Sequence, residues 1–86
     1  MSKESILRLK NEIAQMKNQA AQYKESRIVY IKRLQEQKAY QTNKDSKANL
    51  ARHIIHLKDE LKRNMDTYKR GIEWKKQELN RIKKEG

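Results

Sequence analysis

The clearest chemical pattern in the chain is a series of lysines that recur every seven positions. They form two sets of four: Lys3, Lys10, Lys17 and Lys24, then Lys62, Lys69, Lys76 and Lys83. A lysine ammonium group is a cation with three hydrogen-bond donors, which suits it to phosphates and carboxylates. A seven-residue spacing places each set along one edge of a helix. The pattern predicts either a track for a polyanion or a solvated basic face that keeps the protein in solution.

Catalytic and metal-binding patterns are weak by comparison. The chain has no Cys, no glycine-rich phosphate loop, no nucleophile elbow and no zinc-protease motif. His53 and His56 lie three residues apart near Asp59, but two histidines and a carboxylate do not complete a zinc set. We therefore expect no enzyme activity, no metal site and no cofactor.

Length and composition limit the fold to one small domain with a thin core. The 86 residues carry 22 Lys and Arg against 11 Asp and Glu, a net charge of +11. Apolar residues make up only 35%, against about 45–50% in globular proteins. So few apolar residues cannot fill a thick core, but they can line a seam between two helices. A chain this basic is attracted to nucleic acid, to an acidic protein or to an anionic membrane surface. With no signal peptide or membrane span in the sequence, we expect a cytoplasmic protein.

Residues that step by three and four along the chain predict two helices with coiled-coil seams. The first seam is Ile6, Leu9, Ile13, Met16, Ala20, Tyr23, Arg27, Tyr30 and Leu34. The second seam is Leu50, Ile54, Leu57, Leu61, Met65, Tyr68, Ile72, Lys75, Leu79 and Ile82. The second seam takes an extra step of four from Leu61 to Met65, a stutter that locally unwinds a supercoil.

Residues 41–47 hold the poorest helix formers and predict a turn. Thr42, Asn43, Asp45 and Ser46 can each cap a helix. We expect an all-α antiparallel helical hairpin over residues 1–86, with helices at about 3–41 and 47–84 and a turn at about 42–46. A turn centred near Lys44 makes the numbers of facing residues sum to about 88, which sets apolar residues opposite one another. The alternative is one continuous helix of about 130 Å, because neither Pro nor Gly enforces the turn.

In an antiparallel hairpin the two sets of lysines fall on the same side of the seam, where ordinary pairing would place opposite charges. The other side is mixed, with Glu12 and Glu78 among polar residues. Phosphates along a nucleic-acid backbone would neutralise the lysines and release counterions. Lysine contacts backbone more than it reads bases, so we expect binding of DNA or RNA without sequence specificity. An acidic protein surface is the alternative partner.

A second apolar line predicts contact with another helix. Leu7, Ala14, Ala21 and Ile28 are spaced by seven, Ile31 lies beside them, and Trp74 falls on an outer position of the second helix. These residues would form a dimer seam in a four-helix bundle, or the docking surface of an adaptor, an inhibitor or a structural coiled-coil component. The alternative is a set of incidentally exposed apolar residues.

Overall fold

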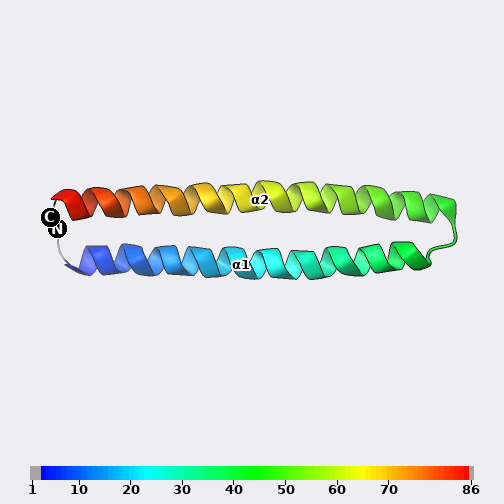
Figure 1. The fold of residues 1–86 in the computed structure, drawn as a ribbon, viewed down its shortest axis with the longest axis horizontal. Coiled ribbons are helices and arrows are strands. Elements are labelled where there is room, and N and C mark those ends of the chain that lie inside the picture. Colours follow the sequence, from blue (N-terminus) through cyan, green and yellow to red (C-terminus); the bar gives the residue numbers. More distant parts are fainter. Residues whose placement is uncertain (1–2, 86) are drawn as a thin grey trace.

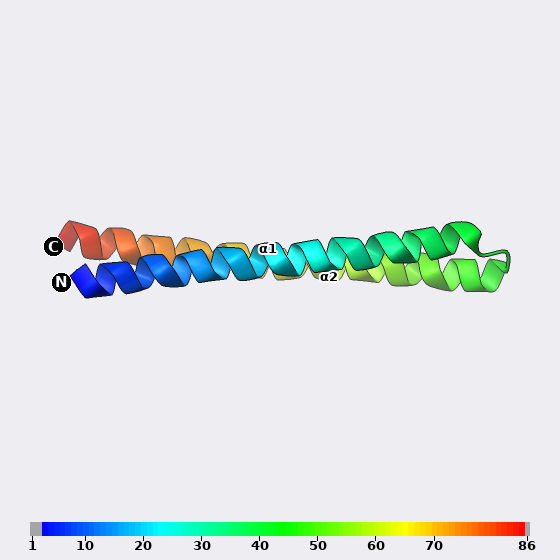
Figure 2. The same ribbon diagram turned by 90° about the horizontal axis from the view of Figure 1, so that it is seen from below.

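The protein is an antiparallel hairpin of two long helices. The computed structural model describes residues 3–85, in which α1 (Lys3–Tyr40) and α2 (Lys44–Glu85) run side by side (Figure 1). The molecule extends 64 Å along its longest axis, half of what one continuous helix would span. The hairpin is therefore confirmed and the continuous rod is wrong. The second view shows the helices crossing at a shallow angle midway along their length (Figure 2), as in a coiled coil.

The turn is shorter than predicted because Asn43 caps α2. The Asn43 side-chain oxygen accepts hydrogen bonds from the backbone amides of Asp45 at 2.9 Å and Ser46 at 3.2 Å. These amides belong to the first helical turn, where no intrahelical acceptor is available. The turn is thus residues 41–43, and α2 begins at Lys44 rather than at the predicted residue 47. Helix α1 ends at Tyr40, one residue before the predicted end.

All the buried apolar residues except Ala20 form two separate clusters along the seam. The open-end cluster, near the helix ends opposite the turn, is formed by Leu9, Ile13, Leu79 and Ile82. The turn-end cluster is formed by Ile31, Leu34, Ile54 and Leu57. Both clusters combine residues whose numbers sum to about 88, such as Leu9 with Leu79 and Leu34 with Ile54. The predicted register is therefore confirmed at both ends of the hairpin.

The first seam contains a stutter where a regular heptad repeat was predicted, so that part of the prediction is wrong. Tyr30 is 43% exposed, whereas Ile31 is only 6% exposed and belongs to the turn-end cluster. The seam of α1 therefore steps by four from Tyr23 to Arg27 and by four again to Ile31. By the register, this stutter lies directly opposite the stutter at Leu61 in α2. Two opposed stutters turn both seams by the same amount, so the helices stay in contact on either side of them.

Neither helix, as described from residue 3 to residue 85, carries an apolar stretch long enough to cross a membrane.

Candidate nucleic-acid interface

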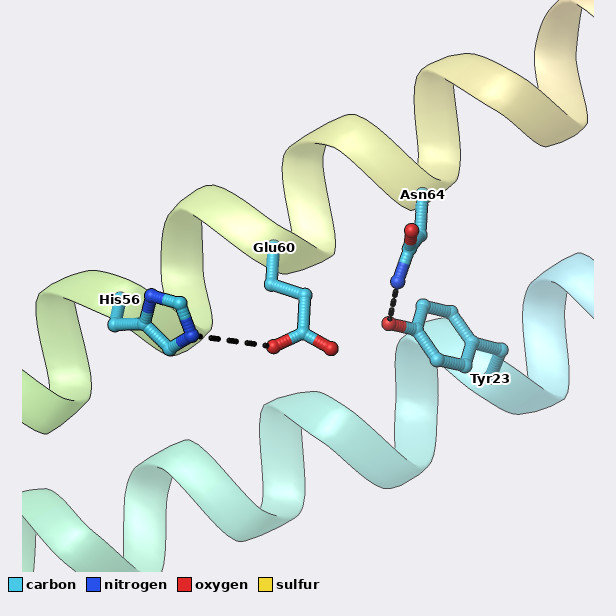
Figure 3. Close-up of polar contacts among 4 residues, drawn as sticks. All are labelled: Tyr23, His56, Glu60 and Asn64. Carbon is cyan, nitrogen blue, oxygen red and sulfur yellow. Dashed lines mark hydrogen bonds and ion pairs between the residues drawn. The ribbon is translucent and has the colours of Figure 1, made fainter.

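Contacts between the helices identify one flank of the hairpin, which we call the mixed flank. Asn64 donates a side-chain hydrogen bond to the Tyr23 hydroxyl across the seam (Figure 3). Further along the same flank, Lys75 Nζ lies 3.0 Å from Glu12 Oε2. The side chains directly before seam residues in both helices, Glu12 and Asn64 among them, therefore share this flank.

The eight lysines occupy the opposite flank, which we call the lysine flank. Seven of the eight directly follow a seam residue, as Lys10 follows Leu9 and Lys69 follows Tyr68, and Lys3 lies seven residues before Lys10 on the same edge of α1. Successive residues of an α-helix are rotated by about 100°, so residues before and after the seam project to opposite sides. The antiparallel arrangement brings the two rows together along the open-end half of the molecule.

All eight lysine side chains are exposed to solvent. Among residues 3–85, Lys75 forms an ion pair with Glu12, and His56, which is charged only when protonated, lies beside Glu60, so no lysine of this flank has a carboxylate partner there. Seven residues of helix span about 10.5 Å, and four such lysines span about 31 Å. The flank is a double row of unneutralised cations over nearly half of the hairpin.

Repulsion within the lysine flank is modest. Packed helices lie about 8–10 Å apart, and the Debye length at physiological salt is about 8 Å. Exposed like charges at such distances cost a few tenths of a kcal/mol per pair. The hairpin tolerates this repulsion between its lysines, and a bound polyanion would remove it.

A polar and aromatic layer separates the two apolar clusters. The Arg27 guanidinium lies 5.6 Å from the centre of the Tyr23 ring, within the range of a cation–π interaction. The Tyr23 and Tyr68 rings lie 5.9 Å apart and are tilted by 44°, and Asn64 bonds the Tyr23 hydroxyl. This layer explains how the seam accommodates Arg27 at the stutter. Asn64 was not among the predicted site residues, although the predicted register places it beside Tyr23.

Lys75 is a structural lysine rather than a member of the lysine flank. Its hydrogen bond with Glu12, and then the charge of that carboxylate, raise the pKa of Lys75 above its ordinary value. The ion pair lets a cation occupy a seam position at the border of the open-end cluster. Its charge is therefore already neutralised within the hairpin.

The second apolar line is only partly as predicted. Leu7 is 59% exposed, and Ala14, Ala21 and Ile28 are also exposed. Ile31 is buried in the turn-end cluster, so its prediction as an interface residue is wrong; the stutter at Arg27 rotates it into the seam. Trp74 is 73% exposed, on the outer side of α2.

The histidines of α2 do not gather with other metal ligands. His56 Nε2 lies 3.7 Å from Glu60 Oε2, one turn further along the helix (Figure 3). Residues 3–85 contain no group of three or more His, Cys, Asp or Glu side chains placed to hold a metal ion.

The fold defines the class of the protein as an all-α antiparallel helical hairpin. Comparisons with protein-family models, curated proteins and solved structures found no match to this chain. What the hairpin can bind therefore has to follow from the charge, exposure and spacing of its own side chains.

Proposed function

We propose that this chain is a small, basic, non-enzymatic accessory protein that binds nucleic-acid backbone through the lysine flank. The observation that carries the proposal is the double row of eight exposed lysines, none of which has a carboxylate partner among residues 3–85. A polyanion laid along this flank would gain from counterion release and relieve the like-charge repulsion. The net charge of +11 would also steer a polyanion to the hairpin over long distances. The compartment in which we propose this activity is the cytoplasm.

The geometry favours backbone contact without base readout. A straight row of about 31 Å covers about nine base pairs, at 3.4 Å per pair. The duplex backbone winds away from a straight rod, so eight phosphate contacts are an upper bound. Each contact contributes about 0.9 to the slope of the logarithm of the binding constant against the logarithm of the salt concentration. For duplex DNA the slope would therefore be no steeper than about −7, and for single strands it would be shallower.

The test is a salt titration of binding to generic duplex DNA and to RNA. The variant replaces Lys10, Lys17, Lys69 and Lys76 with Gln. A matched control replaces Arg8, Arg33, Arg63 and Arg81 with Gln; these residues are exposed and lie off the lysine flank. The lysine variant should lose affinity and flatten the slope by up to about 3.6 on duplex DNA, while the control changes both quantities less.

Two results would contradict the proposal. Equal losses in both variants would mean that only the net charge of the protein matters. Absence of binding to either nucleic acid at low salt would leave an acidic protein surface as the partner of the lysine flank.

The exposed Leu7, Ala14, Ala21 and Ile28 line favours a second candidate function, association with another helix. Buried against a second copy, this line would give a four-helix dimer; buried against another protein, it would make the hairpin an adaptor, an inhibitor or a structural component. Sedimentation of the wild type and of a Leu7→Lys, Ile28→Lys variant separates these cases. A dimer should become a monomer without losing helicity, whereas a monomeric wild type would exclude self-association.

A further inference from the structure

The flank that carries the lysine rows changes character between their end and the turn. Beyond Lys24 and Lys62, its exposed positions include Ile28 on α1 and Ile55 on α2. A hollow of about 420 Å³ lies here between the helices. We call it the turn-end hollow. Its lining includes the apolar residues Ala51, Ile54 and Ile55, which we call its floor, and the lysines Lys38, Lys47 and Lys58, which we call its rim.

The floor of the turn-end hollow leaves apolar surface uncovered. Ile54 packs into the turn-end cluster, but its neighbour Ile55 is 61% exposed. Adjacent helical residues point about 100° apart, so both isoleucines cannot lie in the seam. Covering Ile55 with an apolar side chain would remove this surface from water, which favours binding.

The rim of the turn-end hollow determines the charge of its occupant. Lys38, Lys47 and Lys58 line it together with no Asp or Glu. None of the three belongs to an ion pair among the described residues 3–85. An occupant that carries carboxylates beside its apolar groups therefore complements the site.

Other occupants fit this chemistry less well. A second copy of the chain would bring a further net charge of +11 to a rim that is already basic. A sugar–phosphate backbone would satisfy the lysines but has no aliphatic group to cover Ile55. A helix with an apolar stripe flanked by Glu or Asp satisfies both requirements.

We propose that the turn-end hollow binds an acidic amphipathic α-helix of another protein. Apolar side chains of that helix, one turn apart, cover Ile55 and enter between α1 and α2. Carboxylates on either side of the stripe pair with Lys47 and Lys58. The site uses none of the eight lysines in the two rows, so the inference does not depend on nucleic-acid binding.

The probe for this site is a fluorescein-labelled synthetic helix of about four turns, roughly 14 residues, with Leu along one face and Glu at the flanking positions. Its binding to the full chain is followed by fluorescence anisotropy. One control peptide has every Glu replaced by Lys, and another has every Leu replaced by Ser. Both controls should bind at least about tenfold more weakly.

Variants of the chain assign binding to the turn-end hollow. Ile55→Asp and the pair Lys47→Glu, Lys58→Glu should each weaken binding of the acidic helix by at least about tenfold. The matched control Lys69→Glu, Lys76→Glu changes the net charge equally on the lysine flank and should weaken it by less than about threefold. Circular dichroism should show wild-type helicity in all three, because every substituted side chain is exposed.

Several outcomes overturn the proposal. Unchanged affinity in Ile55→Asp would remove the apolar floor from the site, and equal losses in the two charge variants would reduce the effect to net charge. A loss of self-association in Ile55→Asp, without binding of the acidic helix to the wild type, would identify a second copy as the occupant. Weakened nucleic-acid binding in Ile55→Ser, which adds no charge, would assign the hollow to nucleic acid instead.

Discussion

Replacing Gly71 with alanine should stabilise the hairpin, although Gly71 lies where the two helices approach closely. Gly71 is on the mixed flank of α2, and a Cβ atom added there would lie 3.0 Å from Cε of Met16 in α1. That separation is shorter than the 3.5–4.0 Å or so of an ordinary carbon–carbon contact. The obstructing atom is the end of a flexible, half-buried side chain, so it can move by a few tenths of an ångström.

Two opposing terms set the size of this effect. Replacing glycine by alanine inside a helix contributes about 1 kcal/mol, because the unfolded chain loses less backbone freedom on folding. Moving a methionine methyl group costs less than the 1–3 kcal/mol or so of overpacking a rigid core; we take about 0.5 kcal/mol. The net gain of about 0.5 kcal/mol corresponds to a rise in Tm of about 2–4 °C for a domain of this size.

Thermal unfolding followed by circular dichroism measures this difference. The matched control is Asn80→Ala, an exposed helical position where the change in propensity, up to about 0.7 kcal/mol, acts alone. In a Met16→Ala background, Gly71→Ala should give its full gain of about 1 kcal/mol, because the obstructing methyl group is gone. The reasoning would be refuted if Gly71→Ala lowered the Tm both in the wild type and in the Met16→Ala background. The close contact would then involve the two backbones and not the methionine side chain.

Two further predictions concern the turn and the seam. Asn43→Ala should lower the free energy of unfolding by about 1 kcal/mol, because the amides of Asp45 and Ser46 lose their acceptor; thermal melts should show a smaller change for Thr42→Ala, which removes an exposed side chain of the same turn. The raised pKa of Lys75 in the folded state means that its contribution is fully present below about pH 10.5 and is lost as the pH rises through the folded value. The difference in Tm between wild type and Glu12→Gln should therefore stay constant below about pH 10.5 and shrink above it, and a difference that does not shrink above that pH would contradict the prediction.

The hairpin and its register were predictable because the heptad period is strong over most of both helices. Only one register sets Leu9 opposite Leu79 and Leu34 opposite Ile54, and both pairs lie in the observed clusters. The stutter in α1 was harder to predict because Tyr30 and Ile31 are both apolar. A step of three or a step of four from Arg27 reaches an acceptable seam residue, and only packing against Leu57 decides between them.

The position of the lysine flank could be predicted from the same register, whereas the turn-end hollow could not be predicted from it. The adjacent Ile54 and Ile55 were a signal, since two neighbouring residues cannot both face one partner helix. The hollow also needs the position of Lys38 relative to Lys47 and Lys58, which depends on where the turn ends. Four residues near the turn can cap a helix, and only the structure identifies Asn43 as the cap.

The opposed stutters lead to a final prediction about the length of each helix. Deleting residues 27–30 turns the α1 seam into a regular heptad repeat but leaves the stutter of α2 in place. The part of α1 before the deletion then moves by about 6 Å and turns by about 40° relative to α2, from 1.5 Å and 100° per residue. Leu9 would face Lys75 instead of Leu79, and the open-end cluster would be disrupted.

Deleting residues 58–61 from α2 alone should have the mirror-image effect, and deleting both segments should restore the register. Each single deletion should lower the free energy of unfolding by at least about 3 kcal/mol, the equivalent of exposing two of the four core residues of the open-end cluster. The double deletion should recover to within about 2 kcal/mol of the wild type, because it loses Arg27 and Leu61 but keeps both clusters. Urea denaturation followed by circular dichroism measures all three variants. If the double deletion were no more stable than the weaker single deletion, the two stutters would not be compensating for one another, and the register on which both proposed surfaces depend would need another explanation.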